Sequence, residues 1–296
     1  MKLVTFEQAG KLRPGIWLGD RVIDIAAADG GRLGLESALA FIGAGQAALA
    51  AAAQWSAAPP AGAVIAASAV KLLAPIPRPL KNVFCVGRNY LEHVKEGAEV
   101  RNTALDPPKA PQYFSKPPTA VSGPEAEVSV ARAVSSAVDY EVELGLIIGT
   151  RGRDIAADAV FDHIFGYTVI NDVTARDLQA LHGQWFRGKG LDTTCPMGPW
   201  IVTRDEIADV RKLELTCTVN GERRQTGMVE QMIFDIPTIV STLSAGMTLE
   251  PGDIIATGTP AGVGFAMKPP RLLNDGDVVV CEIAGIGALR NTIRRP

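Results

Sequence analysis

Two glutamates stand two residues apart in the run DYEVELGLIIG, at positions Glu141 and Glu143. On a β-strand, alternate side chains point to the same face, with Cα atoms about 6.5–7 Å apart. The apolar continuation GLIIG indicates a strand that enters a core, where two like charges are costly unless a cation lies between them. The run therefore indicates either a cation site or two solvated glutamates on a half-exposed strand.

A second acidic position ends the strand-like run GYTVIND, and a helix is expected to follow it. Asp172 at the end of a strand is well placed to be a ligand, although an aspartate before a helix is also a common N-cap. Arg176 and Gln179 are three residues apart on the expected helix and therefore share one face. By themselves they would be ordinary surface residues.

The segment CVGRNYLEHVKEGA contains a candidate acid–base pair. His93 precedes Glu96 by three residues, so on a helix the carboxylate could hold one ring nitrogen while the other exchanges protons. The alternative is a chance pair on a solvated helix face. Cys85 lies in the apolar run VFCVG, which favours a buried structural thiol over a nucleophile.

Two glycine-rich segments follow along the chain. Lys189 lies between two glycines in WFRGKGLDTTCPMGPW, a segment too rich in glycine and proline to predict regular structure. Such a lysine could face a developing oxyanion, or it could be a flexible surface residue. The run IIATGTPAGVG lacks the features of a phosphate-binding P-loop. Its amides and Thr259 could contact a small anion, or the segment could be a simple turn.

The composition limits the class of protein. The chain has 296 residues, 47% of them hydrophobic, and a net charge of −3 from 29 basic and 32 acidic residues. This balance argues against a nucleic-acid-binding surface over the whole chain. The 4 cysteines are widely spaced and form no zinc or disulfide pattern. No apolar run suits a signal peptide or a membrane span, so we expect a cytoplasmic protein.

The 30 glycines and 20 prolines imply many turns and favour a β-rich body. We expect short strands within residues 1–25, and Asn220-Gly221 is a strong hairpin signal. The proline-rich run 70–80 predicts a stiff extended connector, which places a boundary between a small domain (1–75) and a main domain (76–296). Helices are expected at 35–42, 46–55, 174–182 and 237–245.

Taken together, six segments resemble the fumarylacetoacetate hydrolase family, in the family's order and over roughly residues 80–290. These are CVGRNYLEH, YFSKPPTAVSG, DYEVELGLIIG, NDVTARDLQ, RGKGLDTTCPMGPW and TGTPAGVG. The closest likeness is to the shorter-chain members: acylpyruvases, fumarylpyruvate hydrolases and hydroxyheptadienedioate isomerases. The resemblance implies a β-rich α+β fold, a mixed β-sandwich or roll with a small N-terminal α+β domain, and a homodimer.

The resemblance also assigns roles to individual residues. It implies that Glu141, Glu143 and Asp172 bind a divalent metal, that His93 and Glu96 activate water, and that Lys189 stabilises an oxyanion. Substrate contacts are expected at Arg88, Tyr90, Arg176, Gln179 and Thr259. Three carboxylates make a hard oxygen site, which suits Mg²⁺ best and Mn²⁺ or Ca²⁺ as alternatives.

The predicted function is metal-dependent hydrolysis of a C–C bond in a 2,4-dioxo acid of the acylpyruvate or fumarylpyruvate type. A metal-stabilised enolate serves two other reactions equally well. These are isomerisation of a 2-hydroxymuconate-type dienoic acid and decarboxylation of a β-keto acid such as oxaloacetate. A protein that only binds small acids would need no acid–base pair, so His93 and Glu96 favour an enzyme.

The segment 91–112 is expected to be a mobile lid. Gly97 is expected to end any helix soon after Glu96, and the run RNTALDPPKAP has few apolar residues to anchor it. The alternative is a permanently ordered excursion held by a dimer partner.

Overall fold

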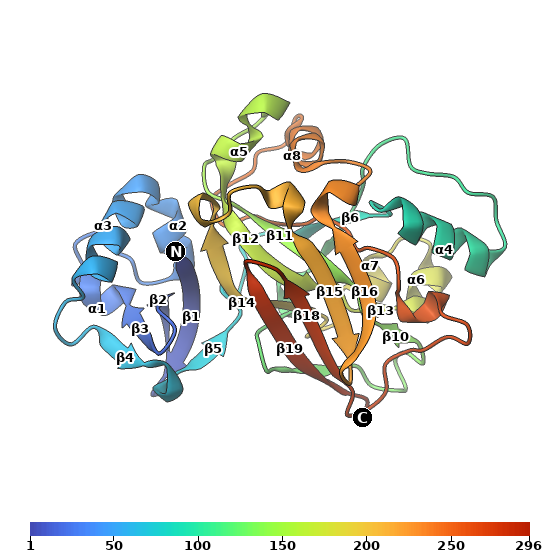
Figure 1. Cartoon of the computed structure of the whole chain (residues 1–296), viewed down its shortest axis with the longest axis horizontal. Helices are drawn as coiled ribbons and strands as arrows, with labels where there is room; N and C mark the ends of the chain where they lie inside the picture. The colour runs from blue at the N-terminus through green and yellow to red at the C-terminus, as the bar shows by residue number, and fades with distance from the viewer.

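The structure is a computed structural model that describes residues 1–296. Its largest element is a mixed sheet that runs through the whole molecule (Figure 1). The order across the sheet is β4 (Val64–Ala66), β3 (Arg21–Asp24), β2 (Lys11–Trp17), β1 (Lys2–Gln8), β14 (Cys195–Thr203), β12 (Ile164–Asn171), β11 (Val142–Ile148), β17 (Ile254–Ala256), β6 (Val83–Gly87) and β7 (Gln112–Lys116), with β5 (Lys71–Leu73) beside β1 and β8 (Val121–Ser122) beside β14.

A second sheet packs against the centre of the first. Its order is β16 (Glu222–Met228), β15 (Glu214–Val219), β18 (Val278–Ile283), β19 (Gly287–Arg294) and β9 (Glu127–Ser129). Strands β11 and β12 contact this sheet. A short ladder of β10 (Val138–Asp139) and β13 (Thr174–Ala175) stands at one end. This is the β-rich α+β architecture that the resemblance implied.

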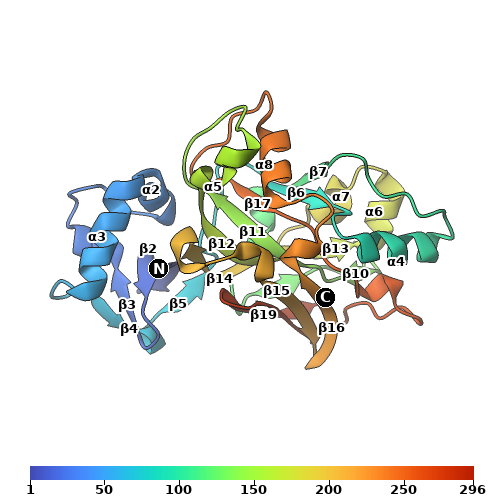
Figure 2. The same ribbon diagram turned by 45° about the horizontal axis from the view of Figure 1, so that its top comes forward.

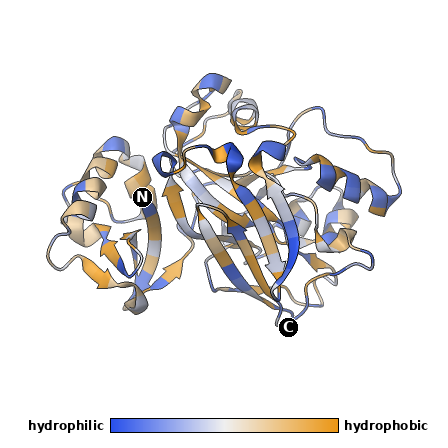
Figure 3. Cartoon of the chain, in the orientation of Figure 1, coloured by the Kyte–Doolittle hydropathy of each residue, from blue (hydrophilic) through white to orange (hydrophobic).

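The buried strand β11 explains why its sequence is apolar on both faces. Leu144 and Leu146 belong to the core between the two sheets. Ile147 belongs to a second core, which the N-terminal helices share. Because side chains alternate along a strand, covering both faces requires a continuous hydrophobic run. Figure 3 shows this concentration of hydrophobic residues in the strands.

The helices lie in three groups around the sheets (Figures 1 and 2). The first covers the N-terminal part, the second lies beside the sheet centre, and the third surrounds the short β10–β13 ladder. They are α1 (Ile25–Asp29), α2 (Ala38–Gly43) and α3 (Gly45–Ala57); α5 (Val160–His163) and α8 (Ile236–Ser244); and α4 (Leu91–Arg101), α6 (Arg176–His182) and α7 (Phe186–Lys189). None of them is long and apolar enough to cross a membrane.

Most of the expected elements are present. The hairpin of β15 and β16 turns at Asn220 and Gly221, whose φ angles of 52° and 79° are those of a type I′ turn. Helices α2, α3, α6 and α8 fall within two or three residues of the predicted ranges. Asp235 caps α8 by accepting a hydrogen bond from the amide of Thr238 at 2.9 Å.

The connector 70–80 is extended as predicted, and its first residues form the strand β5, which pairs with β1. Two local expectations were wrong. Residues 186–189 form the short helix α7 despite their glycine content. Helix α4 continues through Gly97 to Arg101 and ends at Asn102, which has a left-handed φ of 50°. Asparagine tolerates that conformation, so it provides the C-terminal stop that we had assigned to Gly97.

The division into domains at residue 75 stays a prediction. Strand β1 pairs with β14 through Leu3 and Ile201, so one sheet is continuous across the proposed boundary. The second hydrophobic core also spans both parts, because Phe41 of α2 and Ile147 of β11 both belong to it.

Close packing at the sheet centre makes one glycine testable. A Cβ at Gly166 in β12 would lie 2.2 Å from the carbonyl oxygen of Val202, whereas a Cβ at Gly43 would meet nothing within 4 Å. We expect Gly166→Ala to lower the free energy of unfolding by about 1–3 kcal/mol, the usual cost of overpacking. Gly43→Ala should be neutral or slightly stabilising. Urea unfolding of both variants checks this, and equal stability would contradict the packing seen in β12.

Candidate active site

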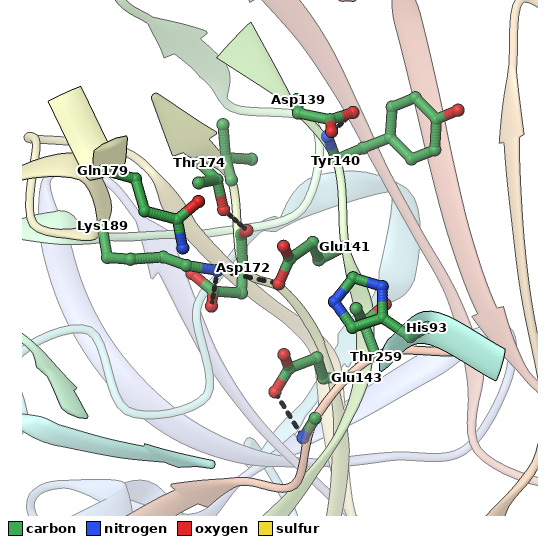
Figure 4. A network of polar contacts seen from close by, with 12 residues as sticks. His93, Asp139, Tyr140, Glu141, Glu143, Asp172, Thr174, Gln179, Lys189 and Thr259 are labelled. Atoms are coloured by element: carbon green, nitrogen blue, oxygen red, sulfur yellow. Dashed lines mark hydrogen bonds and ion pairs between the residues drawn. The ribbon is translucent and has the colours of Figure 1, made fainter. Parts of the chain in front are cut away.

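Three buried carboxylates meet where β11 begins and β12 ends. Val142 pairs with Asn171 in the ladder, which sets Glu141 beside Asp172, and the Asp172 amide donates to the Glu141 carbonyl at 2.9 Å. Glu143 is two residues further along the same face. One oxygen from each of Glu141, Glu143 and Asp172 lies within 4.8 Å of the others, and all three residues are at most 4% exposed. Figure 4 shows the three side chains converging.

Two buried lysines hold this cluster together. Lys189 of α7 contacts the Glu141 carboxylate at 2.8 Å and the Asp172 carboxylate at 2.6 Å (Figure 4). Lys116, the last residue of β7, contacts the other Asp172 oxygen at 2.7 Å. The alternatives of solvated glutamates, a helix-capping Asp172 and a flexible surface lysine are therefore wrong. The position before α6 is Ala175, which makes no side-chain cap.

An arginine completes the compensation of Glu141. Arg176 Nη1 lies 2.7 Å from Glu141, and its Nη2 lies 2.9 Å from Asp139. Asp139 is itself held by the amides of Gly264 and Phe265, at 2.7 and 3.1 Å. The guanidinium is thus fixed from both sides, and it lies 4.4 Å from the ring centroid of Phe265.

The charges in this cluster do not balance. With all four buried carboxylates ionised, the three cations in contact with them would leave one negative charge without a partner. The carboxylates are Asp139, Glu141, Glu143 and Asp172, and the cations are Lys116, Arg176 and Lys189. Burial acts to raise the pKa of Glu141, but Lys189 and Arg176 outweigh it and lower that pKa to about 2. By contrast, burial together with Asp172 and Glu141 raises the pKa of Glu143 well above its usual range. Glu143 is where another cation is needed.

The predicted acid–base pair is formed on α4. His93 Nδ1 lies 2.7 Å from Glu96 Oε1, and Glu96 Oε2 accepts a hydrogen bond from the amide of Gly262 at 2.8 Å. Glu96 therefore fixes the imidazole orientation while Gly262 fixes Glu96. His93 projects from α4 toward the carboxylates, with Nε2 left for chemistry (Figure 4).

One glycine-rich loop after β17 donates amides to three parts of the site. Gly258 donates to Glu143 at 2.9 Å, Gly262 to Glu96 and Gly264 to Asp139. Gly258 and Gly262 have φ angles of 101° and 104°, which favour glycine. A Cβ at Gly262 would also lie 2.1 Å from the Arg224 carbonyl. We had considered this loop as a site for a free anion, but its amides bind the protein's own carboxylates.

A cavity of about 710 Å³ opens over the cluster. It is bounded by most of the predicted site residues: Arg88, His93, Glu141, Glu143, Arg176, Gln179, Lys189 and Thr259. Asp172 lies beneath this surface, fully buried. Gln179 accepts from Arg176 at 3.2 Å, and Thr259 accepts from Gln225 at 2.7 Å.

Tyr90 does not lie on the wall of this cavity. It is 2% exposed and belongs to the hydrophobic core. Burial and the neighbouring Glu143 raise the pKa of its phenol. Substrate contact by Tyr90 stays a prediction that this position does not favour. Cys85, as expected, is buried, and burial raises the pKa of its thiol well above the usual range.

Lys116 and Asp139 were missed from the sequence. Both lie in segments that we had singled out, YFSKPP and DYEVELG, but neither has a spacing that signals a role. Lys116 reaches Asp172 across 56 positions in the chain, and Asp139 reaches Gly264 across 125. Only the strand arrangement brings these partners together.

Comparison with known proteins agrees with this geometry. Residues 82–294 match the family described as fumarylacetoacetate (FAA) hydrolase, C-terminal. The chain belongs to the fumarylacetoacetate hydrolase family. It is 50% identical over 227 residues to oxaloacetate tautomerase YisK of Bacillus subtilis (strain 168), covering 76% of this chain and 74% of that protein. It is also 44% identical over 232 residues to the human mitochondrial oxaloacetate tautomerase FAHD2A, covering 78% and 71%.

Solved structures of the family share the whole fold. A fumarylacetoacetate hydrolase from Exiguobacterium antarcticum superposes with a TM-score of 0.83 at 40% identity, covering 100% of both chains. A 2-hydroxyhepta-2,4-diene-1,7-dioate isomerase from Mycobacterium marinum gives 0.76 at 36% identity, covering 100% of this chain and 98% of that one. The expectation of this family is confirmed.

The buried carboxylates suit a divalent cation. They offer only oxygen ligands, and the raised pKa of Glu143 marks a carboxylate that lacks a counter-charge in the protein. Hard dications such as Mg²⁺ prefer such ligands. Bound there, a dication would turn the cluster from one net negative charge to one net positive charge.

We expect Glu143→Gln to separate metal binding from folding. The amide keeps the shape of the side chain but removes the uncompensated buried charge, so the metal-free variant should unfold at a higher temperature than wild type. Mg²⁺ or Mn²⁺ should raise the melting temperature of wild type by mass action and leave the variant nearly unchanged. Thermal unfolding with and without metal checks both statements. A variant that responds to metal like wild type would exclude Glu143 as a ligand.

Proposed function

We propose that this protein is a metal-dependent tautomerase of oxaloacetate or a closely similar 2-oxo acid. The observation that carries the proposal is 50% identity to oxaloacetate tautomerase YisK over 74% of that protein. This supports the isomerase alternative better than the C–C hydrolase that we first expected. The resemblance to a dienedioate isomerase structure points the same way, because both reactions move a proton along a conjugated oxo acid.

The site has the groups that such a proton transfer needs. In the enol-to-keto direction, a proton is added at C3 while the enol hydroxyl loses one. His93 is the proton donor and acceptor that we assign to C3, since its ring faces the cavity and Glu96 holds its Nδ1 at 2.7 Å. Glu96 orients the ring, so that its Nε2 is the nitrogen left to exchange a proton with substrate.

A divalent cation held by Glu141, Glu143 and Asp172 would polarise the 2-oxo group and stabilise negative charge on its oxygen. Lys189 and Arg176 keep Glu141 ionised and in place, and Lys116 holds Asp172 in place. The resemblance predicts that Lys189 stabilises an oxyanion. Its two carboxylate contacts favour a role in positioning the cluster, and its place on the cavity wall keeps an oxyanion contact as a prediction.

Activity is measured from the decay of enol absorbance when enol-oxaloacetate is added to the protein with Mg²⁺. We expect turnover that a chelator abolishes and Mg²⁺ or Mn²⁺ restores. Release of pyruvate from acylpyruvates, measured in parallel, tests the hydrolase. Fast hydrolysis without tautomerisation would overturn the proposal.

We expect His93→Gln to lower the tautomerisation rate by about 10²–10⁴-fold, the usual contribution of a positioned acid–base group. Glu96→Gln should have a smaller effect, because the imidazole remains and only its orientation and charge stabilisation weaken. Metal-dependent stabilisation should be unchanged in both variants, since neither residue belongs to the carboxylate cluster. A His93→Gln variant with wild-type rates would show that another group transfers the proton.

Two further expectations stay predictions. A homodimer is expected from the resemblance and can be tested by light scattering.

A mobile lid over residues 91–112 is expected from the sequence. Residues 103–110 contain no helix or strand and are mostly exposed, while α4 is held to the glycine loop through Glu96. Hydrogen exchange with and without oxalate would measure whether the amides of residues 91–112 become more protected when a ligand binds.

A further inference from the structure

Four cationic side chains border the cavity, and they divide into two kinds. Arg176 and Lys189 are bound to the carboxylate cluster. Arg88 and Arg101 form no ion pair with any carboxylate. Arg88 donates only to the backbone carbonyl of Asp106, its buried Nε has no partner, and the Arg101 guanidinium makes no hydrogen bond. The cavity therefore carries two positive charges without a direct ion pair, and Asp106 is the one acidic residue outside the cluster that also borders it.

Arg101 lies on the same face of α4 as the proposed acid–base residue. His93, Gly97 and Arg101 are spaced by four residues, and all three border the cavity. Side chains of a helix point toward its N-terminus, so Arg101 leans back over the turn that contains Gly97. Successive members of this series, such as Gly97 and Arg101, are about 6 Å apart along the helix axis. Arg101 is exposed, but its guanidinium lies over Gly97, on the side of the helix that borders the cavity.

Gly97 provides the space for this arrangement. A Cβ at residue 97 would lie 2.8 Å from Nη2 of Arg101. A side chain at residue 97 would require the flexible end of Arg101 to shift from this position. The glycine that we had assigned to ending the helix therefore lies inside it, where it admits the arginine.

We propose that Arg101 and Arg88 together bind the second carboxylate of a dicarboxylic 2-oxo acid and so determine the substrate class. The inference rests on the proposed function, because it assumes that the first carboxylate and the 2-oxo group face the acidic cluster. A substrate with a carboxylate at each end then meets cationic groups at both ends of the cavity. A monocarboxylic 2-oxo acid would leave the two arginines unpaired.

The electrostatics of the two arginines agree with this placement. Burial is the largest cause of the lowered pKa of Arg101, and the nearby charges of Arg88 and Arg176 lower it further. Like charges that are held close together without a counter-ion favour binding of an anion between them. A planar guanidinium also matches the two oxygens of a carboxylate.

The test compares oxaloacetate with its 4-methyl ester, which keeps the 2-oxo acid and loses only the distal charge. We expect Arg101→Gln to raise KM for oxaloacetate by about tenfold to a hundredfold, as loss of a charge-assisted hydrogen bond does. KM for the ester should change by less than twofold, and so should inhibition by oxalate, which has no distal group. Arg78→Gln removes the same charge from an exposed position outside the cavity and should behave as wild type.

Gly97→Ala is a second variant that keeps Arg101 but displaces it. Alanine favours a helix, so folding should be preserved. KM for oxaloacetate should rise while KM for the ester stays the same. If both variants keep the wild-type preference for oxaloacetate, or weaken both ligands equally, the proposal is wrong.

The experiments can show that the tautomerase proposal is wrong without also rejecting the carboxylate site of Arg88 and Arg101. If wild type shows no tautomerase activity, calorimetric titration of the Mg²⁺-loaded protein with oxaloacetate and with the ester still measures the distal contact. Selective loss of oxaloacetate affinity in Arg101→Gln would then support the carboxylate site for another reaction. Equal affinities of wild type for the two ligands would overturn it.

Discussion

The interaction on which the site depends is the compensation of buried negative charge. Asp139, Glu141, Glu143 and Asp172 are each at most 4% exposed, and four ionised groups at such burial would repel one another strongly without partners. Lys116, Lys189 and Arg176 supply three counter-charges, each in direct contact. What is left is one carboxylate, Glu143, with a backbone amide as its only hydrogen-bond donor. This residual charge makes the cluster receptive to a cation.

The glycine-rich loop after β17 places the parts of the site relative to one another. Its amides reach a carboxylate of the cluster, the carboxylate that orients His93 and the carboxylate that anchors Arg176. Backbone amides are rigid donors, so the distances among these three groups depend on the path of one short segment. Positive φ angles at Gly258 and Gly262 allow that path without a steric penalty. Such a loop keeps an acid–base residue from one helix in register with a cluster built on two strands.

The same arrangement suits the proton transfer proposed for this protein. The carboxylate cluster and His93 border one cavity, so a 2-oxo acid bound as proposed would present its C3 to the imidazole. Tautomerisation, isomerisation and hydrolysis all use an enolate beside a proton donor, so these groups alone do not select among them. The proposed distal carboxylate site would make this selection through Arg88 and Arg101, which border the same cavity. Helix α4 carries both His93 and Arg101.

The sequence by itself determined the local features and the candidate carboxylates. Glu141 and Glu143 share a face because alternate residues of any strand do, and His93 meets Glu96 because three residues span nearly one helical turn. The hairpin at Asn220 and Gly221 follows from the same kind of local rule. Long-range pairings were decided only by the tertiary structure. Lys116 meets Asp172 and Gly264 meets Asp139 because strands and loops far apart in the chain pack together. Gly97 is the clearest case in which the sequence was insufficient. A glycine in the sequence indicates a flexible backbone and predicted a helix end, but the structure shows that Gly97 leaves space for the side chain of Arg101.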